Sequence, residues 1–118
     1  MNIGKGLLKL KIWHKKIGYI EYTNIKNIDR EYYNINQYKF DEILYVTKIY
    51  VKEDHRKNGV ARLLVNKIID KARINKKVIC LDAIPFENSI DSNTLCNFYK
   101  KCGFVRGSHP NSFYYIGI

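Results

Sequence analysis

A short basic segment, residues 52–62, lies where a strand is expected to give way to a helix, and it carries one glycine, Gly59. The first backbone amides of a helix have no partners inside the helix and point outward at the positive end of its dipole. Such a junction binds anions, phosphate above all. Gly59 lets a ligand approach the main chain without a Cβ in the way, and Arg56, Lys57 and Arg62 add positive charge. The segment predicts a site for a phosphate-bearing ligand; the alternative is a simple turn with a solvated basic rim.

The elements on either side are those that such a junction requires. Residues 43–52 are strongly apolar and β-branched, which is typical of a central strand covered on both faces. From residue 60 to about residue 76, apolar side chains recur every four positions, which predicts an amphipathic helix packed on the sheet. Residues 78–84 predict a second buried strand, ended by Pro85, which cannot donate a ladder hydrogen bond. Together these segments predict a right-handed β-α-β unit.

The N-terminal part of the chain predicts a hairpin followed by a loop. Residues 7–13 alternate apolar and polar side chains with a period of two, as a strand with one face in the core does. Residues 17–25 are rich in Ile, Tyr and Thr and are expected to pair with the first strand as an antiparallel hairpin. Residues 26–42 are polar and tyrosine-rich without a clean period, so we expect a loop with at most one helical turn.

The C-terminal part predicts a second helix and a second hairpin. Asp91 or Ser92 can cap a helix that runs to Lys101, and the glycine that follows can close it. Residues 104–106 and 113–118 are expected to form the two strands of a terminal hairpin. This hairpin completes the set of elements around the β-α-β unit.

Length and composition set the fold class. A chain of 118 residues with 46% hydrophobic residues has the size and the apolar content of a single domain, which excludes wholesale disorder. No apolar run reaches the roughly 18 residues that a membrane helix needs. We therefore expect one soluble α+β domain over residues 1–118, with a mixed, mostly antiparallel sheet around the β-α-β unit.

Charge and cysteine content limit the partners. The formal net charge of +10 favours phosphorylated ligands, nucleic acid or anionic membrane surfaces, although the basic residues are spread along the chain. Cys80, Cys96 and Cys102 form neither an even framework nor a Cys-x-x-Cys pair, so neither a disulfide scaffold nor a zinc site is expected. The first residues lack the apolar segment of a secretory signal. A cytoplasmic protein without a metal and without membrane contact is the expectation.

Two short motifs resemble the signatures of one enzyme family. Arg56, Gly59 and Ala61 match the pyrophosphate-binding signature of the GCN5-related N-acetyltransferases (GNAT), in which Arg or Gln, two residues, Gly, one residue and then Gly or Ala follow one another. Further along the chain, residues 98–104 are similar to the second signature of that family, Phe-Tyr-x-x-x-Gly-Phe. The resemblance covers residues 43–105 and implies a compact GNAT-like fold with splayed central strands and a C-terminal helix plus hairpin.

The resemblance also implies a cosubstrate and a mechanism. Acetyl-coenzyme A would pair its pantetheine with the main chain of Ile49 and Val51, where the central strands splay apart. The amides expected to hold its pyrophosphate are those of Lys57, Asn58, Gly59, Val60, Ala61 and Arg62. A primary amine would attack the thioester directly and Tyr99 would protonate the departing thiolate, since a reference pKa of about 10 leaves its proton available at neutral pH. The alternative is that Tyr99 is one core aromatic among ten tyrosines.

The sequence departs from the family pattern in three places. Ser92 stands where the family often has an Asn, and it is expected either to contact the cofactor or to cap the helix. Residues 43–52 contain no carboxylate to serve as general base, so Asp82, Glu21 and water remain candidates. The two helices that usually wall the acceptor site have little room before the central strand and are expected to be shortened or absent.

An open acceptor side admits a loop of a macromolecule, so the expected acceptor is a protein lysine or an amino terminus. One alternative is a small-molecule amine such as a polyamine or an aminoglycoside, although a basic surface disfavours cationic substrates. Another is a non-catalytic module that binds RNA or DNA through the tyrosine-rich residues 26–42; no nucleic-acid motif supports it. A homodimer is left open.

Overall fold

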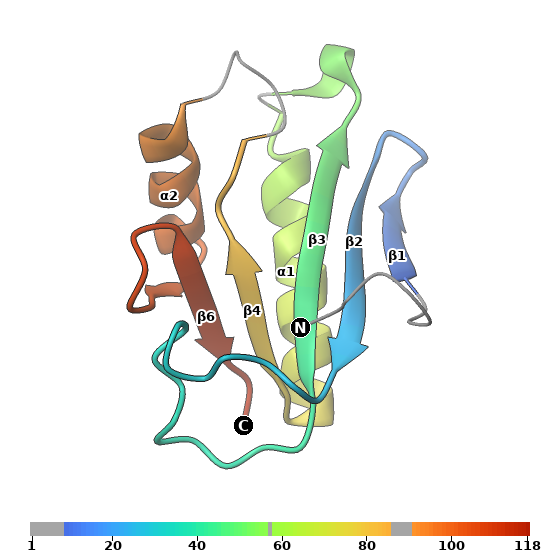
Figure 1. Cartoon of the computed structure of the whole chain (residues 1–118). Coiled ribbons are helices and arrows are strands. Elements are labelled where there is room, and N and C mark those ends of the chain that lie inside the picture. The colour runs from blue at the N-terminus through green and yellow to red at the C-terminus, as the bar shows by residue number, and fades with distance from the viewer. Residues whose placement is uncertain (1–8, 57, 86–90) are drawn as a thin grey trace.

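The computed structural model describes residues 9–56, 58–85 and 91–118, which form one six-stranded sheet with helices packed against it (Figure 1). In chain order the elements are β1 (Lys9–His14), β2 (Gly18–Ile25), β3 (Ile43–Val51), the 3-10 turn η1 (Glu53–His55), α1 (Val60–Asn75), β4 (Val78–Asp82), α2 (Ser92–Lys101), β5 (Val105–Arg106) and β6 (Ser112–Ile116). These elements confirm the order expected from the sequence, from the first hairpin to the last. The part of the first expected strand that precedes residue 9 lies outside the described residues.

The sheet has the strand order β1-β2-β3-β4-β6-β5. Among the described strands only β3 and β4 pair in parallel, and α1 connects them; the other neighbouring pairs are antiparallel. The fold is therefore α+β, with a mixed, mostly antiparallel sheet around a central β-α-β unit, as predicted. The strand expected at residues 78–84 ends at Asp82, and residues 26–42 form turns rather than a helix.

Two apolar clusters cover the two faces of the sheet. On one face α1 and α2 pack over Leu44 and Leu81, and on the other the loop of residues 26–42 packs over Ile43 and Cys80. Because successive side chains of a strand point to opposite faces, the central strands must be apolar on both. This two-sided burial explains why β3 and β4 lack the alternation that β1 shows.

The central strands part at one end of the sheet. Their parallel pairing runs from Ile43 opposite Val78 to Val46 opposite Leu81, and residues 48–51 of β3 pair with β2 alone among the described strands. At the same level the register between β2 and β3 shifts, because the chain of β3 carries an extra residue there. The expected splay of the central strands is thus present from residue 47 onward.

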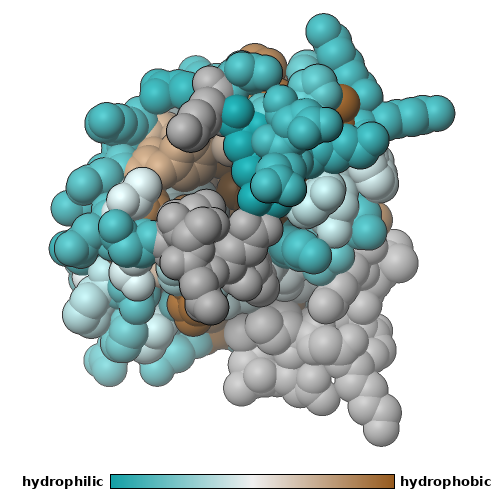
Figure 2. All heavy atoms as spheres, turned by 90° about the horizontal axis from the view of Figure 1, so that it is seen from above, coloured by the Kyte–Doolittle hydropathy of each residue, from teal (hydrophilic) through white to brown (hydrophobic). Residues whose placement is uncertain are grey.

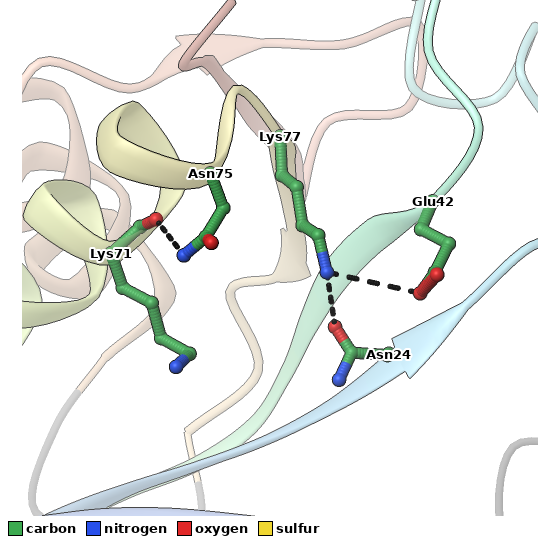
Figure 3. A network of polar contacts seen from close by, with 5 residues as sticks. All are labelled: Asn24, Glu42, Lys71, Asn75 and Lys77. Carbon is green, nitrogen blue, oxygen red and sulfur yellow. Dashed lines mark hydrogen bonds and ion pairs between the residues drawn. The ribbon is translucent and has the colours of Figure 1, made fainter.

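At the opposite end of the sheet, Lys77 connects three segments (Figure 3). Its ammonium donates a hydrogen bond to Asn24 Oδ1 at 3.2 Å and lies 3.8 Å from the carboxylate of Glu42. Beside it, Asn75 Nδ2 donates to the carbonyl of Lys71 near the end of α1. Partly exposed pairs of this kind contribute about 0–1 kcal/mol each. The contacts of Lys77 connect the segment between α1 and β4 to the end of β2 and to the residue before β3.

Helix α2 begins with the first of the two expected caps. Asp91 accepts a hydrogen bond from the backbone N–H of Thr94 at 2.7 Å, and Ser92 is the first residue of the helix. Past the C-terminal end, Gly103 has a φ of +101°, which closes the helix as expected. Within the described residues, no helix is long and apolar enough to cross a membrane.

Candidate active site

The strand-to-helix junction at which the sequence predicts a phosphate site lies where β3 passes through η1 into α1. Gly59 is the N-cap of α1, with a φ of +79° and a ψ of 8°. No side chain caps this helix within the part of the chain that the structure describes, and the first backbone bond of the helix runs from the N–H of Leu63 to the carbonyl of Gly59. The amides that precede Leu63 are therefore available to an anion.

Gly59 is required by its backbone conformation. A Cβ placed there would meet no atom within 4 Å, so the space in front of the helix start is open. A residue with a side chain would nevertheless have to adopt the left-handed region, which costs about 1–2 kcal/mol. The glycine therefore both permits the turn and keeps the helix start unobstructed.

Arg56 ties the loop back to the strand. Its Nε donates to the carbonyl of Val51 at 2.9 Å, and its side chain is half-buried. Val51 itself is buried, Ile49 is partly buried, and both pack into the cluster on the helix side of the sheet. The structure thus brings Arg56 to the end of β3, where the main chain of Ile49 and Val51 runs without a β4 neighbour.

The other residues of the expected phosphate site differ in their surroundings. The side chain of Val60 is buried in the core and Ala61 is partly buried, so each could contribute only its backbone N–H. Asn58 is exposed, and Lys57 lies outside the described residues. Arg62 is exposed and donates from Nη2 to the carbonyl of Lys101 at 3.2 Å, at the end of α2.

Tyr99 lies on α2 and is buried, with 6% of its surface exposed. Its ring packs against those of Phe98, Phe104 and Phe113, with centroid distances of 5.2, 5.7 and 6.1 Å. Burial, and secondarily the nearby Cys102, raises the pKa of Tyr99 well above its ordinary value. The hydroxyl therefore keeps its proton at neutral pH, as a proton donor must.

Ser92 is exposed in the first turn of α2, and the capping role that it could have filled belongs to Asp91. The carboxylate of Glu21 accepts a hydrogen bond from Thr47 Oγ1 at 2.8 Å, at the shift in register between β2 and β3. No group of three or more potential metal ligands is present among the described residues.

The sequence predicts only part of the polar cluster around Asp82. Asp82 was a candidate base, but the two tyrosines that hold it were not predicted: Tyr33 and Tyr45 donate to Asp82 Oδ2 at 2.7 and 2.5 Å. The signal in the sequence was a carboxylate, Asp82, at the end of a strand whose other four residues are buried. Tyr33 comes from the loop and could not be assigned a partner from its position along the chain.

Figure 2 shows the end of the molecule at which β3 and β4 separate. Hydrophilic residues make up most of the described surface in this view, and apolar atoms are visible between them. The unpaired edge of β3 and the uncapped start of α1 both lie at this end.

A family model described as an acetyltransferase (GNAT) domain matches residues 10–106, which is most of the chain. The match includes both motifs, the junction before α1 and the Phe-Tyr segment of α2. No curated protein matches the sequence.

Several solved structures share the fold. The anti-CRISPR protein AcrVA5 is 21% identical, with a TM-score of 0.67 over 91% of this chain and 97% of its own. NAA60 from Arabidopsis thaliana, solved in complex with acetyl-CoA, is 21% identical, with a TM-score of 0.62 over 85% of this chain and 65% of its own. The aminoglycoside 6'-N-acetyltransferase AAC(6')-IG from Acinetobacter haemolyticus is 18% identical, with a TM-score of 0.55 over 90% of this chain and 68% of its own. At these identities the likeness establishes the fold.

Proposed function

This chain belongs to the GNAT acetyltransferase family, and from that premise we propose that it transfers an acetyl group from acetyl-coenzyme A to a primary amine of a protein, either a lysine side chain or an amino terminus. The observation that carries the proposal is a convergence at one end of the sheet. The uncapped helix start at Gly59, the part of β3 beyond Val46 and the end of α2 that bears Tyr99 all meet there.

The described residues fit the cosubstrate by charge and by hydrogen-bonding capacity. The pyrophosphate would lie on the amides from Asn58 to Arg62, and Arg62 itself reaches from this turn toward α2. The unpaired edge of β3 at Ile49 and Val51 offers main-chain groups to the amides of pantetheine. When bound, the thioester supplies the electrophilic carbon for the acetyl transfer.

Tyr99 is proposed to protonate the departing thiolate. Burial keeps its hydroxyl neutral, and the three surrounding rings hold the phenol in one orientation. The neutral acceptor amine attacks the thioester carbonyl, the C–N bond forms, and the C–S bond breaks with transfer of the phenolic proton to sulfur. The nitrogen releases one proton to a base, for which Asp82, Glu21 and water are the candidates, and solvent returns a proton to Tyr99. General acid catalysis of this kind contributes about 10²–10⁴-fold in rate.

A macromolecular acceptor is favoured by the face of the sheet away from the helices. Described residues 9–42 contain no helix, so nothing helical walls this side before β3. Trp13, Tyr19 and Tyr50 are direct cross-strand neighbours there, with Trp13 52% and Tyr50 37% exposed. Exposed aromatic rings in a row are typical of surfaces that contact other macromolecules.

The nucleic-acid alternative receives less support. It relied on the tyrosines of residues 26–42 as a stacking surface, yet Tyr33 is buried and Tyr32 and Tyr38 are partly buried against the second core cluster. A stacking platform needs exposed ring faces. The labelling experiment described next distinguishes a small-molecule amine acceptor from a protein acceptor.

Two measurements test the proposal. Acetyl-coenzyme A at a hundredfold excess over its dissociation constant stabilises the native state by about 2.7 kcal/mol, so the melting temperature should rise. Isotope-labelled acetyl-coenzyme A is then added to a cell lysate with and without the protein, and acetylated peptides and acetylated small amines are identified by mass spectrometry. No thermal shift at millimolar cosubstrate contradicts the cofactor site, whereas label confined to small amines contradicts the protein acceptor.

A further inference from the structure

Three aromatic side chains form a row across β1, β2 and β3, which lie side by side at one edge of the sheet (Figure 1). Trp13 on β1 is the cross-strand partner of Tyr19 on β2, and Tyr19 is the partner of Tyr50 on β3. Their ring centroids lie 4.9 and 5.5 Å apart. Ile12 and Ile20, which alternate with these residues, pack into the cluster under the helices. Because successive side chains of a strand point to opposite faces, the three rings lie on the side without helices.

A row of charged side chains runs beside the rings on the same face. Lys11 is the cross-strand partner of Glu21, and Glu21 is the partner of Lys48. The carboxylate of Glu21 also accepts a hydrogen bond from Thr47 Oγ1. Two lysines against one acid make this face positive, in agreement with the net charge of +10 on the whole chain. We refer to the two rows together as the aromatic-lysine patch, which consists of Lys11, Trp13, Tyr19, Glu21, Lys48 and Tyr50.

The lysines of the patch lie over its rings. Lys11 Nζ is 4.4 Å from the ring centroid of Tyr19 and 5.9 Å from that of Trp13. Lys48 Nζ is 5.9 Å from the ring centroids of both Tyr19 and Tyr50. An ammonium group at such a distance is attracted by the negative face of the ring. Each ring of the row therefore has a positive charge close to it.

Lys11 can bind an anion without leaving its place over the rings. Among the residues that the structure describes, its ammonium contacts these two rings and no hydrogen-bond acceptor. The side chain is exposed, and an ammonium group carries three hydrogen-bond donors. A carboxylate that approaches from solvent therefore finds both a positive charge and donors at Lys11.

The patch adjoins the part of β3 that is proposed to hold the cosubstrate. Tyr50 lies between Ile49 and Val51, whose side chains pack under the helices and whose main chain is proposed to bind pantetheine. Trp13 is 52% and Tyr50 is 37% exposed. A chain seated on the patch would thus lie beside the opening between β3 and β4, with aromatic rings as its apolar contacts.

The positions of the lysines favour carboxylates over nucleobases as the groups that bind. A base that stacks on an aromatic ring needs the open face of that ring. Here Lys11 lies over Tyr19, and Lys48 lies near both Tyr19 and Tyr50, so a stacked base would have to displace the ammonium groups. A carboxylate binds the ammonium groups where they are. A cationic segment would be repelled by them.

We propose that the aromatic-lysine patch docks an acidic segment of the acceptor protein, with carboxylates at the lysines and apolar groups on the rings. This inference rests on the acetyl-transfer function proposed above and names the kind of sequence that lies next to the acceptor amine. Three strands spaced about 4.8 Å apart give the patch a width of about 10 Å, which is the length of three extended residues.

The test uses the full-length protein and two matched peptides without tryptophan. Each has one lysine and a blocked amino terminus; the first carries three glutamates on either side of the lysine, and the second carries glutamines instead. Trp13 is the single tryptophan of the chain, so its fluorescence reports directly on occupation of the patch. The glutamate peptide should change this fluorescence and bind roughly 2- to 30-fold more tightly than the glutamine peptide, the range for two exposed ion pairs. The difference should shrink as salt is added.

Acetylation of the same peptides connects the patch to the reaction. The peptide pair is also made with a free amino terminus and norleucine in place of the lysine, so that either acceptor amine can react. Whichever amine is acetylated, kcat/KM should be higher for the glutamate version, through a lower KM. If the acetyl-transfer function itself is wrong, the glutamate peptide still changes the fluorescence of Trp13, but no peptide is acetylated and acetyl-coenzyme A causes no thermal shift.

Two variants separate the charged contacts from the apolar ones. Lys11→Gln should reduce the preference for the glutamate peptide by roughly 2- to 5-fold, the range for one exposed ion pair. Tyr50→Ala should weaken both peptides by at least about fivefold, because the ring contact is common to them. The matched control is Lys71→Gln, since Lys71 Nζ also lies 5.9 Å from a ring centroid, that of Tyr22 on the helix side, and this variant should leave the preference unchanged. If Tyr50→Ala fails to fold, Lys11→Gln and its control still decide the outcome.

Three results would overturn the inference. The first is fluorescence of Trp13 that neither peptide changes at millimolar concentration, and the second is equal affinity for the glutamate and glutamine peptides. The third is tighter binding of a single-stranded oligothymidylate than of the glutamate peptide, with the same change in the fluorescence of Trp13, which would assign the patch to nucleic acid. An equal loss of preference in Lys11→Gln and Lys71→Gln would likewise contradict a contact at the patch, because only the total charge would then matter.

Discussion

The guanidinium of Arg62 donates a hydrogen bond to the carbonyl of Lys101 at 3.2 Å, which joins the first turn of α1 to the last turn of α2. A cation at a helix C-terminus also interacts favourably with the dipole of that helix. The contact connects the helix start proposed to bind phosphate with the helix that carries Tyr99. The two motifs, which are separate along the chain, therefore lie side by side in the folded protein.

Replacing Arg62 should therefore affect both stability and cofactor binding. We expect Arg62→Gln to lower the free energy of unfolding by less than about 1 kcal/mol, because the contact is exposed. It should weaken acetyl-coenzyme A binding by roughly tenfold, as loss of one charge-assisted contact would. The matched control is Arg73→Gln in the last turn of the same helix. Calorimetric titration measures the affinity of the two variants for acetyl-coenzyme A, and urea unfolding measures their stability. Equal affinities for the two variants would contradict the role of Arg62.

Gly59 offers a comparison of two substitutions. Gly59→Ala places a Cβ in the space proposed for the ligand and forces a left-handed conformation, so it should lower stability by about 1–2 kcal/mol and weaken cofactor binding less than a larger, charged side chain does. Gly59→Glu adds bulk and negative charge where phosphate is proposed to lie, so it should abolish the thermal shift with acetyl-coenzyme A. A Gly59→Glu protein that still binds would show that the phosphate site lies elsewhere.

Tyr99→Phe tests the proton donor. Phenylalanine keeps the ring and its packing against Phe98, Phe104 and Phe113, so the fold and the cofactor affinity should be retained. Turnover should fall by roughly 10² to 10⁴-fold, the range for loss of one general acid. The experiment pairs a thermal melt with an acetyl-transfer assay. Full turnover in a stable variant would show that Tyr99 is a core aromatic residue and not the proton donor.

Stability should fall in alkaline solution. Burial raises the pKa of Tyr33, Tyr45 and Tyr99 above the value of about 10 that tyrosine has in an unfolded chain. Their stabilising contribution is complete below pH 10 and is lost as the pH rises from there toward the higher values of the folded state. Urea midpoints measured from pH 8 to pH 11 should drop above about pH 10. Tyr45→Phe should show a shallower drop, and an identical slope would argue against buried tyrosine as the cause.

Gly107 controls how closely the terminal hairpin approaches the loop. A Cβ at this position would lie 2.9 Å from the backbone of Tyr33 and 2.5 Å from Ser112 Oγ. Gly107→Ala should therefore displace the loop and weaken the bond from Tyr33 to Asp82, with a loss of about 1–3 kcal/mol in stability. Unchanged stability would show that the loop accommodates the methyl group.

The sequence by itself determined the helices, the strands and the position of the strand-to-helix junction that is proposed to bind phosphate. Periods of two and of four residues, Gly59 before α1 and the acid that caps α2 are local signals, because each acts within a few residues of the chain. Local signals of this kind do not predict the cluster of Asp82, Tyr33 and Tyr45. Tyr33 lies 49 residues and Tyr45 lies 37 residues from Asp82, and no local rule selects those two from ten tyrosines. Only the folded chain, with the loop packed over one face of β3 and β4, brings their hydroxyls to one carboxylate oxygen and leaves the other oxygen without a donor.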